Sequence, residues 1–128
     1  MNKLTASLED YLEVICNFND TNKNFRAIDI SKELKVSRAS VTEALKKLEK
    51  KGYINYGRYE AISLTNTGRE IAQNIVSKHA ILQIFFENIL NLSKEEASLN
   101  ACKIEHVITD SAFNKIKEYI NEVPQWNL

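Results

Sequence analysis

The stretch AIDISKELKVSRASVTEALKKLEKKGYI, residues 27–54, decides the fold. Its first half has apolar residues that suit a short helix, Ile28, Ile30 and Leu34, and the tripeptide KVS that follows suits a tight turn. Ser37 is a good N-cap for a second helix, after which apolar residues recur on one helical face: Val41, Ala44, Leu45 and Leu48. Gly52, which follows two lysines, is typical of the residue just beyond a helix end. Two short helices joined by a tight turn, the second one basic, predict a helix-turn-helix.

The residues after this stretch predict a β-hairpin. Two short strands are expected around 53–56 and 61–64, with Gly57 and Arg58 in the loop between them. Before the stretch, residues 7–18 predict a helix with three side chains on one face, Leu8, Leu12 and Ile15. A helix, a helix-turn-helix and a hairpin in this order predict a winged helix, a fold used mostly to bind DNA.

The rest of the chain predicts helices. Thr65 and Ser93, the latter with Glu96 in a capping box, are expected N-caps. The long helix after Thr65 has one apolar stripe that includes a histidine: Ile71, Ile75, His79, Leu82 and Phe86. A final helix is expected over about 110–121, before Pro124.

The helical half also predicts a dimer. The stretch ILQIFFENILNL, residues 81–92, is more apolar than one short helix needs, and a helix-turn-helix dimer doubles its contacts on a palindromic operator. The alternative is that this stretch only extends one core. We therefore expect a mainly α fold, with an N-terminal winged helix-turn-helix DNA-binding domain over 1–70 and an all-helical dimerisation and metal-binding domain over 71–128.

Composition is that of an ordinary globular protein, with 44% hydrophobic and 27% charged residues. The N-terminal residues lack the apolar segment of a signal peptide, and no apolar run approaches the roughly 20 residues that span a bilayer. The two cysteines, Cys16 and Cys102, lie far apart and form no framework pattern. We expect a cytoplasmic protein with reduced thiols, and a disulfide between the two is the alternative.

Charge is distributed unevenly along a chain whose formal net charge is zero. Residues 23–58 hold ten Lys or Arg against four Asp or Glu, a balance of +6. Residues 71–128 hold five basic against seven acidic side chains, a balance of −2. A basic block suggests an anionic partner, nucleic acid first, although a solvated helix face explains the same charges.

The segment NACKIEHVITD, residues 100–110, contains one of the two cysteines and one of the two histidines. In a helix, Cys102, Glu105 and His106 at i, i+3 and i+4 would share a face. Such a trio could bind a metal, cut a bond or fill a core. Cys102 alone is best explained as a small buried hydrophobe, and the catalytic alternative lacks an oxyanion-hole loop and a third orienting group.

Five segments in order and register resemble the diphtheria-toxin-repressor family of metal-dependent transcriptional repressors: LTASLEDYLEVI, VSRASVTEALKKLEKKGYINY, LTNTGREIA, SKHAIL and ACKIEHVITD. The resemblance covers residues 4 to about 120. It implies a homodimer that binds a palindromic operator when loaded with Fe(II) or Mn(II) and shuts off metal-uptake genes. Longer members continue into a small β-barrel domain, so the chain resembles a short form.

The resemblance also implies a set of metal ligands: Asp10, Glu13, His79, Cys102, Glu105 and His106. Manganese-type members carry a carboxylate where Cys102 stands and iron-type members a thiol, whereas Asp10 and Glu13 match the manganese type. Because a thiolate favours softer ions, we expect Fe(II) in preference to Mn(II). An ancillary site of iron-type members would also need an acid and a second histidine, where this chain has Gln83 and Ser98. The resemblance therefore implies one principal site, holding one or two ions.

For DNA, the N-terminal turns of the second helix of the helix-turn-helix are the expected readers of base edges. Residues of this helix, its N-cap and one residue of the hairpin loop are expected to contact DNA: Ser37, Arg38, Ala39, Ser40, Thr42, Glu43, Lys46, Lys47 and Arg58. The last three are expected on phosphates. Two alternatives are a winged-helix dimer that senses an organic ligand or partner protein, and a metal-buffering protein; we expect no enzyme activity.

Overall fold

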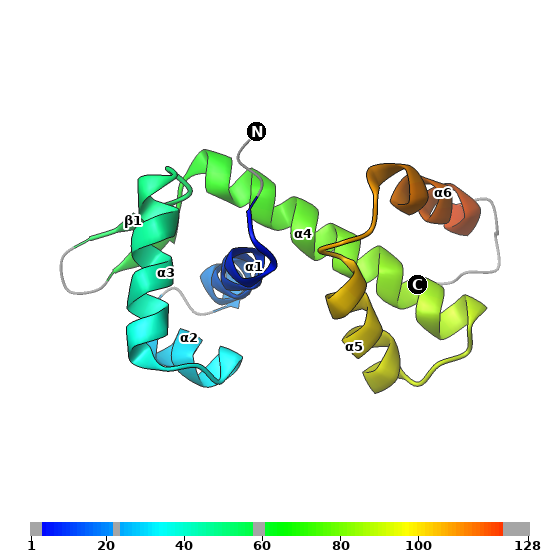
Figure 1. The fold of residues 1–128 in the computed structure, drawn as a ribbon, viewed down its shortest axis with the longest axis horizontal. Coiled ribbons are helices and arrows are strands. Elements are labelled where there is room, and N and C mark those ends of the chain that lie inside the picture. Colours follow the sequence, from blue (N-terminus) through cyan, green and yellow to red (C-terminus); the bar gives the residue numbers. More distant parts are fainter. Residues whose placement is uncertain (1–3, 22–23, 58–60, 122–128) are drawn as a thin grey trace. The chain divides into compact units, whose positions relative to one another are not determined.

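A computed structural model describes residues 4–21, 24–57 and 61–121 of the 128-residue chain. The chain divides into two compact units, Met1–Asn74 and Ile75–Leu128. In the part of the chain that the structure describes, the first unit contains three helices, a two-stranded sheet and the start of a fourth helix, and the second unit is helical (Figure 1). None of the helices in the described part of the chain is both long and apolar enough to cross a membrane.

The first helix, α1 (Ala6–Thr21), forms the centre of the first unit. It begins after Thr5, whose Oγ1 accepts the backbone N–H of Leu8 at 3.2 Å and so satisfies one of the unpaired donors of the first turn. The predicted apolar face is buried, together with two neighbours: Leu8, Tyr11, Leu12, Ile15 and Cys16. The opposite side leaves Asp10 and Glu13 partly exposed.

The predicted helix-turn-helix consists of α2 (Ala27–Leu34) and α3 (Arg38–Lys50). Lys35 ends α2 in the left-handed conformation, with φ of 57°, which turns the chain sharply toward α3. The Ser37 hydroxyl accepts the N–H of Ser40 at 3.1 Å, so the predicted N-cap of α3 is confirmed. The four predicted core positions of α3 are all buried: Val41, Ala44, Leu45 and Leu48.

The wing is an antiparallel pair of strands, β1 (Ile54–Tyr56) and β2 (Ile62–Leu64). Ile54 pairs with Leu64 and Tyr56 with Ile62. The predicted strands are confirmed to within one residue at each start. The loop position Arg58 lies outside the described residues.

The long helix α4 (Asn66–Ile84) begins in the first unit and continues into the second. Thr65 caps it by accepting the N–H of Gly68 at 3.0 Å, and its hydroxyl donates to the carbonyl of Gly52 at 2.7 Å. The start of α4 is therefore tied to the end of α3. The predicted helix does not stay regular to Leu90, because the last turns form a π-helix, η2 (Phe85–Ile89).

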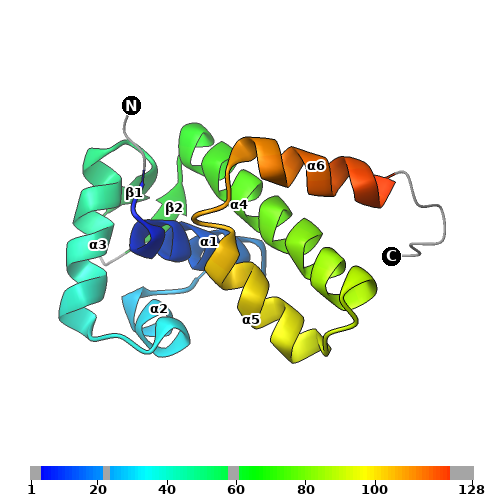
Figure 2. The ribbon, with the colours of Figure 1, turned by 45° about the vertical axis from the view of Figure 1, so that its right-hand side comes forward.

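In the second unit, α5 (Lys94–Ile104) and α6 (Asp110–Asn121) lie beside the second half of α4 and η2 (Figure 2). Ser93 caps α5 by accepting the N–H of Glu96 at 3.1 Å, as predicted. One apolar cluster holds the unit together around four buried residues: Leu82, Phe86, Ala97 and Ala101. Part of the apolar stretch 81–92 is thus used within the chain, whereas Leu90 is 50% exposed. The predicted mainly α fold, a winged helix-turn-helix followed by helices, is confirmed.

Candidate metal centre and DNA-binding helix

A buried acid–base cluster lies in the second unit, around Glu105. His79 on α4 places its Nδ1 2.7 Å from Oε1 of Glu105. Glu105 is only 4% exposed, and it is the single charged side chain buried to this degree in the described part of the chain. Because a buried carboxylate is costly unless cations or donors surround it, this cluster is the strongest indication of a site.

The second oxygen of Glu105 lacks a hydrogen-bond partner. Oε2 is buried, and Nε2 of His106 lies 3.9 Å from it, beyond hydrogen-bond distance. Each oxygen of Glu105 therefore has an imidazole nitrogen near it, but only His79 is hydrogen-bonded to Glu105. A buried carboxylate oxygen without a hydrogen bond, close to imidazole nitrogens, is suited to binding a divalent cation.

Cys102 and His106 form the other donor pair of this unit. Sγ of Cys102 and a ring nitrogen of His106 lie within 4.8 Å of each other. The prediction that Cys102, Glu105 and His106 share one helix is wrong in part, because α5 ends at Ile104. Glu105 is the C-cap, with helical φ and ψ, and His106 lies in the following turn, so the backbone still carries the three donors around one further turn.

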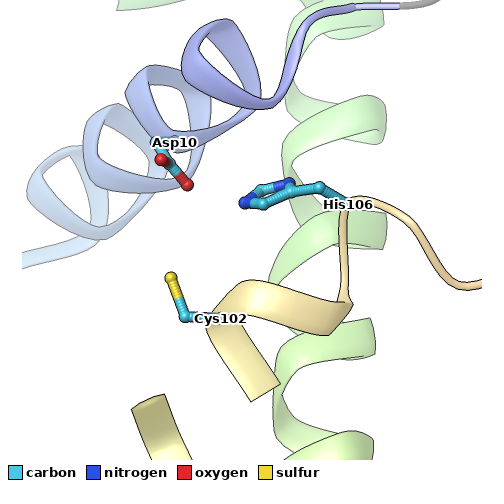
Figure 3. Close-up of side chains that lie close together, drawn as sticks. All are labelled: Asp10, Cys102 and His106. Atoms are coloured by element: carbon cyan, nitrogen blue, oxygen red, sulfur yellow. The ribbon is translucent and has the colours of Figure 1, made fainter. Parts of the chain in front are cut away.

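The two expected ligands of the first unit, Asp10 and Glu13, are three residues apart on α1 and so project from the same side of this helix. Both are partly exposed. Figure 3 shows the Asp10 carboxylate on α1 together with Cys102 in the last turn of α5 and His106 in the turn after it. Asp10 and Glu13 are the expected ligands that come from the DNA-binding half.

The six expected ligands form a mixed donor set. Two imidazoles suit transition metals, three carboxylates suit Mn(II) and Fe(II), and one thiol favours softer ions. The donors in the second unit therefore fit a first-row transition metal better than Ca²⁺ or Mg²⁺, which take oxygen ligands.

The other cysteine is not a candidate ligand. Neither Cys16 nor Cys102 forms a disulfide, so the disulfide alternative is excluded. Cys16 is buried in the first unit, and burial, followed by the nearby Asp20 carboxylate, raises the pKa of its thiol, while Arg69 lowers it. A thiol of this kind stays protonated and unreactive at neutral pH.

The two positions that depart from an ancillary metal site have partners of their own. Nε2 of Gln83 donates to Oε2 of Glu87 at 3.0 Å. The Ser98 hydroxyl lies 3.4 Å from Nε2 of His79. The sequence did not indicate this second contact, because the two residues are 19 positions apart and on different helices.

The N-terminal turns of α3 present the expected DNA-contacting side chains. Most of them are exposed: Ser37, Arg38, Ala39, Ser40, Glu43, Lys46 and Lys47. Thr42 is partly exposed. Nζ of Lys47 lies 3.8 Å from Oε1 of Glu43, a solvent-exposed pair that is worth little and leaves Lys47 available for a phosphate.

Comparison with known proteins identifies both halves. A family model described as "Iron dependent repressor, N-terminal DNA binding domain" matches residues 3–62, and one described as "Iron dependent repressor, metal binding and dimerisation domain" matches residues 65–125. The chain belongs to the iron-dependent repressor family. It is a metal-responsive transcriptional regulator, and the resemblance stated from the sequence is confirmed.

Relatives match this chain over more than nine tenths of its length. An HTH-type transcriptional regulator of Methanocaldococcus jannaschii, MJ0568, is 36% identical over 120 residues, which is 93% of this chain and 96% of that protein. The regulator MntR of Oceanobacillus iheyensis is 32% identical over 117 residues, 91% of this chain and 79% of that protein.

Solved members of the iron-dependent repressor family have the same fold. The manganese regulator SloR matches with a TM-score of 0.81 and 25% identity, over 91% of this chain and 54% of that one. A manganese-dependent transcriptional repressor in complex with manganese matches with a TM-score of 0.82 and 26% identity, over 89% of this chain and 52% of that one. The chain therefore spans about half the length of these two solved regulators.

Proposed function

We propose that this chain is a repressor of metal-uptake genes, which binds a palindromic operator as a homodimer when it is loaded with a divalent transition metal. The observation that carries the proposal is Glu105, a buried carboxylate with one oxygen on His79 and the other without a hydrogen bond. A structural role would leave this carboxylate as a net cost to folding. A cation bound at this site would compensate the buried charge.

The proposed ligands come from both units. The second unit supplies His79, Cys102, Glu105 and His106, and α1 of the first unit supplies Asp10 and Glu13. One bound divalent ion would offset two of the four negative charges of the three carboxylates and the thiolate, and two ions would offset all four. The part of Asp10 and Glu13 in the proposal is supported by the family resemblance and by their shared side of α1.

We propose Fe(II) as the ion, with Mn(II) as its competitor. The thiol of Cys102 supports iron, because thiolate ligands favour softer ions than carboxylates do. Relatives named as manganese regulators support the competitor. The six ligands can hold one ion or divide between two.

The mechanism follows from where the ligands are attached. Helix α1 belongs to the unit that carries the recognition helix, and Cys102, Glu105 and His106 belong to the unit matched as metal-binding and dimerising. Without metal, the carboxylates of the ligand set repel one another. An ion that needs ligands from both units favours the geometry that presents both recognition helices of a dimer to DNA. A 100-fold activation requires only about 2.7 kcal/mol of differential affinity.

The contact with DNA is proposed for α3 and the wing. Ser37, Ala39 and Ser40 are small and lie at the start of α3, where they permit close approach to base edges. Arg38, Lys46 and Lys47 are exposed cations for phosphates or guanine. Because the family is one of transcriptional regulators, we assign no catalytic role to Cys102 and His106.

The test is a gel-shift titration with the promoter DNA upstream of the protein's own gene. Fe(II) under anaerobic conditions, Mn(II), or a chelator is added to the wild-type protein and to three variants. Glu105→Ala and His106→Ala should lose metal-dependent DNA binding, whereas Glu118→Ala, which removes an exposed carboxylate on α6, should behave as wild type. Equal DNA affinity with metal and with chelator would contradict the proposal.

A further inference from the structure

Ser98 contacts the ring of His79 on the side away from Glu105. Its hydroxyl lies 3.4 Å from Nε2, while Nδ1 lies 2.7 Å from the Glu105 carboxylate. All three residues belong to the second unit, and Ser98 is partly buried in the second turn of α5. The ring of His79 is therefore bracketed by a hydroxyl and a carboxylate.

The Glu105 contact decides which ring nitrogen carries the proton. A carboxylate can only accept, so at 2.7 Å Nδ1 must donate its proton to Oε1. Nε2 of a neutral ring then has a lone pair, and the Ser98 O–H lies where it can donate to it. The hydroxyl thus supports the Nδ1–H tautomer in the metal-free protein.

The requirement reverses when an ion is bound. If His79 held an ion through Nδ1, its ring proton would lie on Nε2, and that N–H would need an acceptor. A hydroxyl is both donor and acceptor, so Ser98 can serve the ring in either state, which a methyl or an ammonium group cannot.

We propose that Ser98 is a positioning residue of the metal site, whose hydroxyl orients the His79 ring through Nε2 and stabilises whichever tautomer the ligand state requires. This inference rests on the proposed function. Neighbouring Gln83, one turn further along α4, is hydrogen-bonded to Glu87, whereas the Ser98 hydroxyl lies 3.4 Å from Nε2 of His79. Partners of metal-binding histidines at this distance tune affinity about 10- to 100-fold when they are removed.

The first measurement uses the metal-free protein. Long-range ¹H–¹⁵N spectra report the tautomer and hydrogen bonding of each histidine ring at fixed pH. In Ser98→Ala, the Nε2 resonance of His79 should move, because its hydrogen-bond donor is lost, while the His106 resonances stay in place. Ser98→Thr, which keeps the hydroxyl, should restore the wild-type spectrum.

The second measurement is the Mn(II) affinity of the same variants. Ser98→Ala should weaken binding about 10-fold and Ser98→Thr should recover most of the loss. Ser111→Ala, which removes an exposed hydroxyl on α6, is the matched control and should change neither measurement. Thermal melts identify any variant that has lost its fold.

The outcomes separate this inference from the function on which it rests. A folded Ser98→Ala protein with an unmoved His79 Nε2 resonance would overturn the positioning role, whatever its affinity for Mn(II). A moved resonance with wild-type Mn(II) affinity would also overturn it, since the ring would then be oriented without consequence for the ion. Failure of the wild-type protein to bind either Mn(II) or Fe(II) would instead overturn the proposed function.

Discussion

At the scale of the residue, Glu105 is a charged side chain whose burial costs folding free energy. Its carboxylate is buried, and only one of its two oxygens has a hydrogen bond. Such a group stays in a protein at a cost of about 1–3 kcal/mol when nothing else compensates it. Two histidines, His79 and His106, lie near its oxygens, and the thiol of Cys102 lies three residues earlier in the chain. The protein therefore keeps a charge that folding alone does not require.

The substitution Glu105→Gln should separate the effect of this residue on the stability of the metal-free protein from its proposed effect on metal binding. The amide oxygen can still accept from Nδ1 of His79, and the buried charge is gone, so the free energy of unfolding of the metal-free protein should stay the same or rise by about 1 kcal/mol. The increase in melting temperature on adding Mn(II) should disappear. Chemical denaturation without metal and thermal melts with metal measure the two effects. A variant less stable without metal, yet still stabilised by Mn(II), would show that Glu105 is structural.

The buried side chains of Cys16 and Tyr11 predict how the stability of the protein depends on pH. Burial raises the pKa of both groups above their ordinary values of 9.0 and 10.0. The unfolded chain then loses these protons at lower pH than the folded one, so their stabilisation is complete below pH 9.0 and is lost as pH rises beyond it. Denaturation at pH 7, 9 and 10.5 should show falling stability. In Cys16→Ala the free energy of unfolding should fall less steeply with pH. If it falls as steeply as in the wild type, groups other than Cys16 cause the loss of stability.

At the scale of elements, caps account for where most helices begin. Ser37, Thr65 and Ser93 each accept a backbone N–H of the turn that follows, as the sequence predicted. Gly68, in the first turn of α4, allows the helix to pass close to the backbone of Tyr53. A Cβ at this position would collide with the backbone carbonyl of Tyr53, so α4 can start here only because residue 68 has no side chain.

Gly68→Ala should therefore destabilise the first unit by about 2 kcal/mol or more, because the obstructing atoms are backbone and cannot rotate away. Gly57→Ala is the matched control, since a Cβ there meets nothing within 4 Å. Urea denaturation of both variants measures the difference. Equal stability of the two would mean that α4 can shift away from Tyr53 at little cost.

The elements also show what sequence reasoning could and could not reach. Local signals, namely the caps, Gly52 and the period of apolar residues, predicted the winged helix and the order of the helices. They did not predict η2, because the switch from α- to π-helix depends on how Phe86 and its neighbours pack in the second unit. The end of α5 before Glu105 and the contact of Ser98 with His79 were missed for a similar reason. Each depends on residues distant in the sequence.

At the scale of the whole molecule, the chain has two units joined through α4. The six proposed ligands are distributed between them, two on α1 and four in the second unit. If all six serve one centre, the ion stabilises both units together. If the ion uses only His79, Cys102, Glu105 and His106, it stabilises the second unit alone, and the recognition helix has no way to respond through α1.

Hydrogen exchange distinguishes these two cases. Saturating Mn(II) should slow exchange of backbone amides in α5 and, if Asp10 and Glu13 are ligands, in α1 as well, since binding stabilises each unit that contributes to the site. At 100 times the dissociation constant the gain is about 2.7 kcal/mol. In the double variant Asp10→Asn, Glu13→Gln the protection of α1 should vanish while that of α5 persists in reduced form. Glu9→Gln, also on α1, is the matched control and should leave both helices protected. Wild-type protein in which Mn(II) protects α5 and leaves α1 unchanged would restrict the metal site to the second unit and remove the mechanical link to DNA.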